Sequence, residues 1–148
     1  YKDYSWAACA TEILFHADTY KIELTKSWNV MDIGKVVNEK IAMGQAEGGI
    51  LQGLAYGGSE FFYKPGFGRM HGFTDYALPT TLDLPEMDIE FIHTDSEIAK
   101  GLGEIPMDFP APSVRNAFHN ATGILIDEYP LIPERLFNEL SKANSGGK

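Results

Sequence analysis

Glu104 is the residue whose setting in the sequence most suggests chemistry. It lies in the stretch AKGLGEIP (residues 99–106), after two glycines and before a proline. Glycine lets a ligand approach the main chain closely, whereas proline restricts the residue that precedes it. A carboxylate on such a loop, partly desolvated by apolar neighbours, would be a competent general base. The same stretch also fits a loop acid that bonds backbone amides, and the spacing leaves both interpretations open.

Other chemical motifs are weak or missing from the sequence. The four histidines fall in no spacing that gathers two metal ligands, so we predict no metal-ligating residues. The sequence has no nucleophile elbow, phosphate-binding loop or dinucleotide-binding glycine pattern. Acidic residues are available for a glycosidase pair, but nothing in the sequence places two of them across one bond. Glu104 therefore remains the leading candidate.

Length and composition favour one acidic globular domain. Of the 148 residues, 44% are hydrophobic and 22% are charged, and the net charge is −9. An acidic chain is poorly suited to binding a nucleic-acid backbone, and no apolar run approaches the ~18 residues that a membrane-spanning helix needs. Cys9 stands alone, so we expect a buried structural thiol, no internal disulfide and a cytoplasmic location.

The apolar spacing predicts an α+β fold in which helices pack on a mostly antiparallel sheet. Residues 4–16 and 21–34 have the composition of two strands joined by a short turn, which indicates a hairpin. Residues 85–93 alternate as a half-buried strand. Four apolar side chains of equal parity are expected on one face of the second strand: Ile22, Leu24, Trp28 and Val30.

Helices are expected before and after the loop that carries Glu104. One of the later helices is expected to start at Pro112, with Ser113 as its cap, and to end at Gly123. A closing helix begins at Pro133 and packs on the rest of the domain. The predicted domain covers residues 1–140, and residues 141–148 are expected to form a flexible tail.

A glycine-faced helix is predicted within residues 41–62. Gln45, Gly49, Gly53 and Gly57 recur every four residues and therefore stack on one face. Each glycine in a helix interior costs about 1 kcal/mol relative to alanine, so the repeat implies close approach by a backbone or a ligand. Tight helix-to-sheet packing explains the repeat as well. Gln45 is expected near the helix N-terminus, where free N–H groups favour an anionic neighbour.

Five stretches are distinctive as an ordered set. They are WNVMDIGKVVNEKIAMGQ (28–45), GQAEGGILQGLAYGGSE (44–60), FTDYALPTTLDLP (73–85), AKGLGEIPMDFPAP (99–112) and YPLIPERL (129–136). Together they resemble the molybdenum-binding subunit of the xanthine dehydrogenase/aldehyde oxidase family of molybdenum hydroxylases, over about residues 4–140. One departure is VVNEKIA (36–42), where many family members have Asn-Pro after the Asp-x-Gly stretch.

The resemblance implies a role for each candidate residue. Glu104 matches the family's catalytic glutamate, which takes a proton from a molybdenum-bound hydroxide or water so that the oxygen attacks an electron-poor carbon. Gln45 matches a glutamine that lies against the cofactor, and the molybdopterin-lining loop is matched by Lys100, Gly101 and Gly103. The substrate class implied is a purine-like heterocycle or an aldehyde, and LGEIPMD favours the xanthine dehydrogenase type.

The resemblance also implies that this chain alone is incomplete and inactive. It corresponds to a C-terminal minority of the molybdenum subunit, a fragment without most of the cofactor cradle. The expected partners are the remainder of that subunit, iron–sulfur and FAD domains or subunits, a small-molecule substrate and a second copy of the chain. One cysteine is too few to ligate an iron–sulfur cluster. The alternative is a non-catalytic α+β interaction or assembly module without cofactor.

Overall fold

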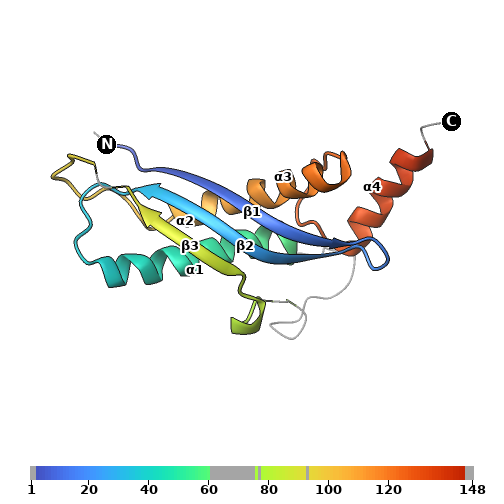
Figure 1. The fold of residues 1–148 in the computed structure, drawn as a ribbon, viewed down its shortest axis with the longest axis horizontal. Helices are drawn as coiled ribbons and strands as arrows, with labels where there is room; N and C mark the ends of the chain where they lie inside the picture. The colour runs from blue at the N-terminus through green and yellow to red at the C-terminus, as the bar shows by residue number, and fades with distance from the viewer. Residues whose placement is uncertain (1–2, 61–75, 77, 93, 146–148) are drawn as a thin grey trace.

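The computed structural model describes residues 3–60, 76, 78–92 and 94–145. Its elements are β1 (Trp6–His16), β2 (Lys21–Asp32), α1 (Glu39–Gly58), the 3-10 turn η1 (Thr81–Asp83), β3 (Glu86–Phe91), α2 (Ile105–Asp108), α3 (Pro110–Thr122) and α4 (Pro133–Ser145). The strands form one layer and α1, α2 and α3 form a second, while α4 lies near the β1–β2 turn (Figure 1). The predicted α+β class is confirmed.

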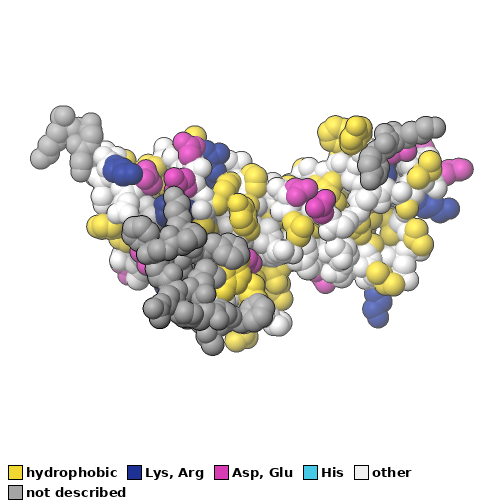
Figure 2. Space-filling view, turned by 180° about the vertical axis from the view of Figure 1, so that it is seen from behind, with side chains coloured by type: hydrophobic (Ala, Val, Ile, Leu, Met, Phe, Trp, Pro, Cys, Tyr) yellow, Lys and Arg dark blue, Asp and Glu magenta, His cyan; other side chains and the backbone are white. Residues whose placement is uncertain are grey.

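Apolar side chains are found on the surface as well as in the core. Figure 2 shows them interspersed with acidic and basic side chains on the face opposite to that of Figure 1. The most exposed of the large apolar side chains include Leu82, Val37, Ile41 and Trp6, at 96%, 84%, 70% and 69%. These side chains have little cover from the described parts of the chain.

The three strands form a mixed sheet in the order β1-β2-β3. β1 and β2 make the predicted antiparallel hairpin, and Tyr20 closes its turn with a φ of 59° and an N–H donated to the His16 carbonyl at 2.7 Å. β3 pairs with β2 in parallel, and the connection between them carries α1. The parallel pairing of β3 with β2 was not part of the sequence prediction.

A β-bulge interrupts the hairpin near its middle. Glu12 pairs with Lys26, but the next residue, Ile13, pairs with Leu24. Thr25 is therefore an extra residue in β2, and its hydroxyl donates to the Glu12 carboxylate at 2.6 Å. Because side chains alternate with a period of two along a strand, one extra residue exchanges the two faces beyond it.

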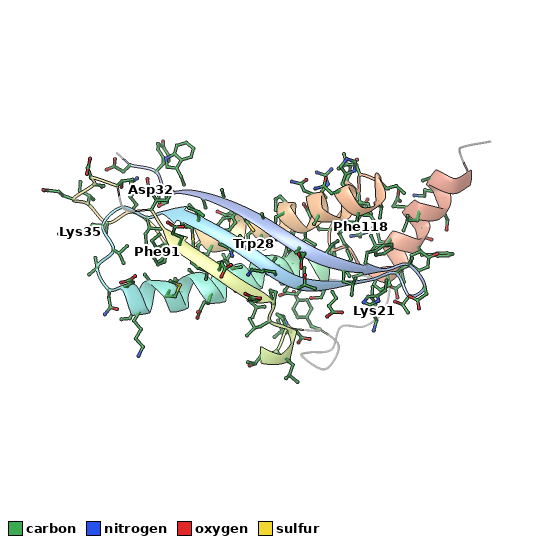
Figure 3. The ribbon with its side chains drawn as sticks, viewed as in Figure 1. Lys21, Trp28, Asp32, Lys35, Phe91 and Phe118 are labelled. Atoms are coloured by element: carbon green, nitrogen blue, oxygen red, sulfur yellow. The ribbon has the colours of Figure 1, made fainter. Side chains whose placement is uncertain are left out.

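The bulge changes which residues of β2 face the helices. Ile22 and Leu24 pack against the core, as predicted. The prediction that Trp28 and Val30 share that face was wrong, because beyond the bulge the buried residues are Ser27, Asn29 and Met31. Trp28 is 40% exposed, and Figure 3 shows it over the open face of the sheet.

The core lies between the sheet and the helices α1 and α3. Phe118 of α3 is fully buried and meets the Phe15 ring edge-on, with 5.2 Å between ring centroids. Figure 3 shows Phe118 where α3 runs behind β1. The buried cluster is Met31, Ile33, Ala42, Ala46, Ile50, Leu54, Phe91, Val114, Phe118, Ile126, Leu131 and Leu136.

α3 begins earlier than the sequence predicted. Its first residue is Pro110, and the Ser113 hydroxyl donates to the Pro110 carbonyl at 2.7 Å from inside the first turn. The predicted start at Pro112 with Ser113 as cap was therefore wrong. Gly123 ends the helix as predicted, with a φ of 74° and an N–H donated to the His119 carbonyl at 2.7 Å.

α4 begins at Pro133 and runs to Ser145, so it continues into the stretch 141–148 that was expected to be a tail. Leu136 is buried in the core cluster. Phe137 is 50% exposed and touches Tyr20, with 5.3 Å between ring centroids. The helix is thus anchored mainly through its first turns.

Candidate functional site

α1 starts before the glycine-rich part of its sequence. Asn38 caps the helix by accepting the Ile41 N–H at 3.1 Å, and Glu39 is the first helical residue. Counted from Glu39, Gln45 is the seventh residue of the helix, so it lies beyond the first turn, whose N–H groups are free. The prediction that Gln45 lies at the helix N-terminus was wrong, and the argument for an anion at that position does not apply.

The glycine face of α1 lies against the segment that follows Glu104. A Cβ built on Gly49 would lie 2.6 Å from the Pro106 Cβ, and one on Gly53 would lie 2.6 Å from the Met107 carbonyl oxygen. Gly57 continues the same contact along α3. Within the described chain, the close neighbours of the glycine face are therefore backbone and proline ring atoms of residues 106–111, and α1 contacts that segment directly.

Glu104 stands at the start of α2 with its carboxylate exposed. Its carbonyl accepts the Met107 N–H at 2.8 Å, while its side chain makes no capping bond and no ion pair to the described residues. The alternative of a loop acid that bonds backbone amides is thus not realised within the described chain. Apolar neighbours were expected to desolvate this carboxylate, but they leave it exposed.

Gln45 and Gly103, two residues proposed from separate stretches, are joined directly. The Gln45 side-chain amide donates a hydrogen bond to the Gly103 carbonyl at 3.2 Å. Gln45 is exposed, as are Gly103 and Glu104. The structure therefore brings the glutamine of α1 to the residue that immediately precedes the candidate base.

Gly101 and Gly103 differ from the packed glycines of α1, Gly49, Gly53 and Gly57. A Cβ at Gly103 would meet nothing within 4 Å, and one at Gly101 would meet only the Ser5 hydroxyl, at 4.0 Å. Neither has a positive φ. Contacts within the described chain therefore do not require glycine here, and the main chain of the loop is open on this side.

Sequence reasoning missed the residues that hold the base of this loop. Asp32, at the end of β2 (Figure 3), accepts the Gly34 N–H at 2.9 Å and pairs with the Lys100 ammonium at 2.7 Å. The Lys100 and Asp32 side chains are 11% and 13% exposed. Lys100 was expected along the cofactor, but its charged group is turned to Asp32. The Asp-x-Gly spacing, which is typical of an Asx-turn, was the available signal.

The donors around Asp32 affect the titration of its carboxyl. The Lys100 ammonium, and after it the Gly34 N–H, lowers the pKa of the Asp32 carboxyl below its ordinary value. Thr94 adds a weaker hydroxyl contact to the same carboxylate at 3.4 Å. Asp32 is therefore held in its ionised form.

Two other features of the described chain lie away from this loop. Cys9 is partly buried, and its thiol donates to the Ser113 hydroxyl at 3.3 Å, which fits a structural role. Within the described residues, no group of three or more His, Cys, Asp or Glu is placed to hold a metal ion. These features add no second candidate centre.

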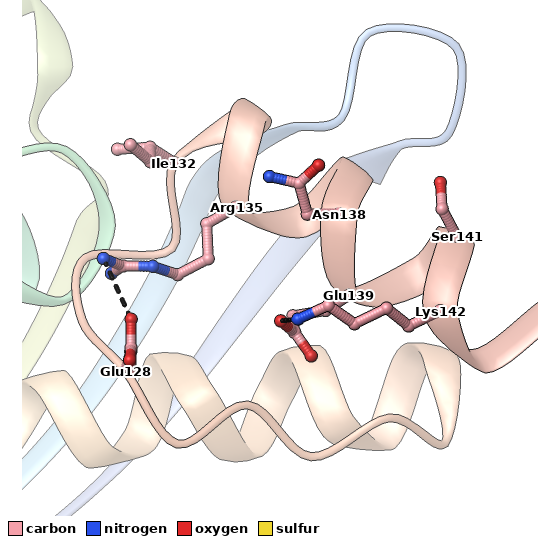
Figure 4. A pocket seen from close by; sticks show the side chains of 7 residues that line it. All are labelled: Glu128, Ile132, Arg135, Asn138, Glu139, Ser141 and Lys142. Atoms are coloured by element: carbon pink, nitrogen blue, oxygen red, sulfur yellow. Dashed lines mark hydrogen bonds and ion pairs between the residues drawn. The ribbon is translucent and has the colours of Figure 1, made fainter.

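A shallow hollow lies beside α4. Figure 4 shows it crossed by the Arg135–Glu128 ion pair at 3.4 Å and the Lys142–Glu139 pair at 2.6 Å. None of the candidate site residues lines it, and α4 lies at the far end of the molecule from α2 (Figure 1). The loop that carries Glu104 thus remains the candidate site.

The comparison with protein families identifies the class. A model of the molybdopterin cofactor-binding domain matches residues 1–85, and the chain belongs to this family. The resemblance found in the sequence is thereby confirmed. Among the described helices, none is both long and apolar enough to cross a bilayer.

Individual relatives are subunits of molybdenum enzymes. The chain is 34% identical over 130 residues to the putative xanthine dehydrogenase molybdenum-binding subunit XdhA of Escherichia coli K12, covering 83% of this chain and 17% of that subunit. It is 26% identical over 148 residues to the aldehyde oxidoreductase molybdenum-binding subunit PaoC of the same strain, covering 95% and 20%. The chain thus spans about a fifth or less of these relatives.

Solved structures show the same fold within much larger chains. Quinoline 2-oxidoreductase from Pseudomonas putida 86 matches with a TM-score of 0.73 at 28% identity, over 88% of this chain and 18% of that one. The aldehyde oxidoreductase of Desulfovibrio gigas matches with a TM-score of 0.84 at 24% identity, over 93% and 15%. The second likeness concerns the fold alone.

Proposed function

We propose that this chain forms one wall of the active site of a molybdenum hydroxylase and supplies its base, Glu104. One observation carries the proposal: an exposed carboxylate without a partner in the described chain stands on a loop whose neighbouring residues are fastened. Gln45 holds the carbonyl of Gly103, and the Ser5 hydroxyl donates to the carbonyl of Gly101 at 2.6 Å. A general base needs such a combination of free acceptor and fixed position.

The open main chain at Gly101 and Gly103 fits a cofactor that lies against it. Nothing in the described chain occupies the space beside these two glycines, which leaves room for a group outside these residues to approach the main chain. We assign this group to the molybdopterin that the family binds, with Gln45, Gly101 and Gly103 along it. When bound, the molybdenum–molybdopterin group supplies the redox centre that accepts the electrons of substrate oxidation.

Glu104 acts in this proposal as the proton acceptor. Its carboxylate takes a proton from a water-derived nucleophile, which then attacks an electron-poor carbon of the substrate. Because residues 106–111 lie against the backbone of α1, the start of α2 is fixed beside Gln45. This chain leaves Glu104 exposed, so the desolvation that strengthens a base comes from substrate, cofactor or other polypeptide.

The favoured substrate class is a purine-like heterocycle, with aldehydes second. Identity is 34% to the xanthine dehydrogenase subunit XdhA and 26% to the aldehyde oxidoreductase subunit PaoC. Relatives with nitrogen heterocycles in their names include an isoquinoline 1-oxidoreductase and a nicotine 6-hydroxylase. The sequence LGEIPMD around Glu104 supports the same order of substrate classes.

The complete site requires more polypeptide than this chain. The described residues leave Trp6, Val37 and Ile41 largely exposed, and the chain spans 17% of its xanthine dehydrogenase relative. We propose that the rest of the molybdenum subunit covers such surface, that iron–sulfur and FAD modules are partners on other domains or subunits, and that the assembly is cytoplasmic. Self-association through the uncovered surface is the corresponding expectation for the isolated chain.

Replacing Glu104 by glutamine in the cofactor-loaded protein tests the proposal. The variant keeps the size of the side chain and removes its basicity, so kcat should fall by about 10²- to 10⁴-fold while molybdenum and pterin contents stay unchanged. Glu134→Gln is the matched control, because Glu134 is an exposed acid of α4 at the other end of the molecule. Glu134→Gln should leave kcat and the molybdenum and pterin contents at the wild-type values.

The alternative of a non-catalytic interaction module gives the opposite result. Membership of the cofactor-binding family does not favour it. If Glu104→Gln turned over substrate as fast as the wild type, the assignment of Glu104 would be wrong. If the purified assembly also carried no molybdopterin, the module interpretation would replace the proposal.

A further inference from the structure

A short junction fastens the base of the Glu104 loop to the end of β2. The Lys35 N–H donates to the Ile98 carbonyl at 3.0 Å, and the Lys100 N–H donates to the Ile33 carbonyl at 2.8 Å. Between these two bonds, Gly34 and Ala99 form an isolated antiparallel bridge. The backbone of 98–100 is thus paired with the turn that follows β2.

The turn side of this junction tolerates little change. Gly34 has a φ of 66°, and a Cβ placed there would lie 2.3 Å from the Ile98 carbonyl oxygen. Asp32 fixes this conformation by accepting the Gly34 N–H on one carboxylate oxygen and the Lys100 ammonium on the other. One carboxylate therefore holds both sides of the junction.

We propose that Asp32 and Lys100 are positioning residues for the proposed base Glu104. Lys100 precedes the two open glycines, which by themselves offer the main chain no stiffness, so the orientation of the loop at its start is set by the ion pair. The far end of the loop is set by the contact of Pro106 with Gly49. Glu104 stands between these two fixed points.

The low exposure of the pair gives it more influence than a surface ion pair has. Solvent screens exposed pairs strongly, but the Asp32 and Lys100 side chains are both mostly covered. The carboxylate also receives the Gly34 N–H, so its acceptor sites are matched by donors from two segments. Removing either charge leaves the other partly buried without its counterion.

The test uses three substitutions in the cofactor-loaded protein. Asp32→Asn and Lys100→Met remove one charge each with little change in size, and Lys100→Arg retains the charge. Lys26→Met is the control: Lys26 lies on β2, as Asp32 does, but its pairs with Glu86 at 2.7 Å and with Asp88 at 3.0 Å join it to β3, away from the loop. Hydrogen exchange of the segment 98–104, kcat and KM are measured for each.

A positioning role predicts a specific combination of results. Asp32→Asn and Lys100→Met should speed exchange in 98–104 by about 10-fold or more and lower kcat by about 10- to 100-fold, with KM within about 3-fold of wild type. Lys100→Arg should retain most of kcat. Lys26→Met should change neither the hydrogen exchange of 98–104 nor kcat. A pair with a purely structural role would lower the amount of folded, cofactor-loaded protein and leave kcat per loaded molecule unchanged.

The proposal rests on the proposed function, and the two can fail separately. Unchanged exchange in 98–104 would overturn the fastening of the loop, whatever the activity. Faster exchange with normal kcat, in a protein that Glu104→Gln inactivates, would overturn the positioning role alone. Normal turnover of Glu104→Gln would overturn the assignment of the base and, with it, the positioning of that base.

Discussion

The side-chain amide of Gln45 donates to the backbone carbonyl of Gly103, which immediately precedes Glu104. This bond links α1 to the loop before α2 at the point where a base and a cofactor wall were both expected. It also gives the glutamine a role that does not depend on a helix N-terminus. The amide is held by protein on its nitrogen side, and its oxygen makes no hydrogen bond to the described residues.

The glycines of α1 should fall into two classes on substitution. Gly49→Ala places a Cβ 2.6 Å from Pro106 and should lower the free energy of unfolding by about 1–3 kcal/mol. Gly48→Ala is the matched control, because nothing lies within 4 Å of its Cβ, and it should raise stability by up to about 1 kcal/mol. Urea unfolding measures both; equal effects would contradict the packing of the glycine face.

Gly103→Ala should separate folding from cofactor binding. The added methyl meets no atom within 4 Å, so the thermal unfolding midpoint of the cofactor-free protein should stay within about 2 °C of wild type. If molybdopterin lies against this main chain, the pterin and molybdenum content of the purified protein should fall. Normal cofactor content would show that the loop faces something else.

Phe118 should be a stability hot spot of the core. Its side chain is fully buried and stacks edge-on against Phe15, so Phe118→Ala should cost about 3–5 kcal/mol of unfolding free energy. Phe137→Ala removes a ring that is 50% exposed and should cost about 1 kcal/mol. Chemical denaturation of the two variants checks the contrast, and a reversal of their order would place the core elsewhere.

Acid should weaken the Asp32 junction with a defined sign. The folded-state pKa of Asp32 is lowered, so its contribution to stability is fully present above the ordinary pKa of 3.8 and is lost as the pH falls through the lower folded value. The stability difference between wild type and Asp32→Asn should therefore shrink below about pH 4. Circular dichroism during urea unfolding at pH 7, 4 and 2.5 measures it; a constant difference would contradict the pairing.

The parts of the fold that follow from local pattern were predicted well. Alternating apolar residues specified the hairpin, Gly123 marked the end of α3, and Pro133 marked the start of α4. Each of these signals depends on neighbours within a few residues. The α+β class follows directly from the order of such elements.

The errors came from features that a single stretch of sequence does not encode. The extra residue Thr25 preserves strand composition while it exchanges the faces of β2, so Trp28 was placed on the wrong side. The parallel pairing of β3 with β2 depends on the path of the chain between the two strands. The start of α1 at Glu39 depends on its cap, which the glycine pattern did not reveal.

The candidate site was only partly predictable for a similar reason. Glu104 and Gln45 stood out by residue type and by resemblance, and their shared contact with the loop appears only in the fold. The Asp-x-Gly spacing marks a turn at Asp32, but nothing in the sequence indicates its partner Lys100, which tertiary structure brings to it. Residues that hold others in place are hard to recognise without the fold.

The three side-chain contacts to the Glu104 loop also determine when it can take shape. Ser5 to Gly101, Asp32 to Lys100 and Gln45 to Gly103 join residues that are 96, 68 and 58 positions apart. Contacts between residues so far apart form late in folding, because the entropy of closing the long loop is lost before the contact itself stabilises the chain. During synthesis, the hairpin and α1 leave the ribosome well before the loop with which they form these contacts. The segment around Glu104 is therefore held by residues that lie far apart in the sequence, and a nascent chain that ends before residue 103 cannot form all three of these contacts.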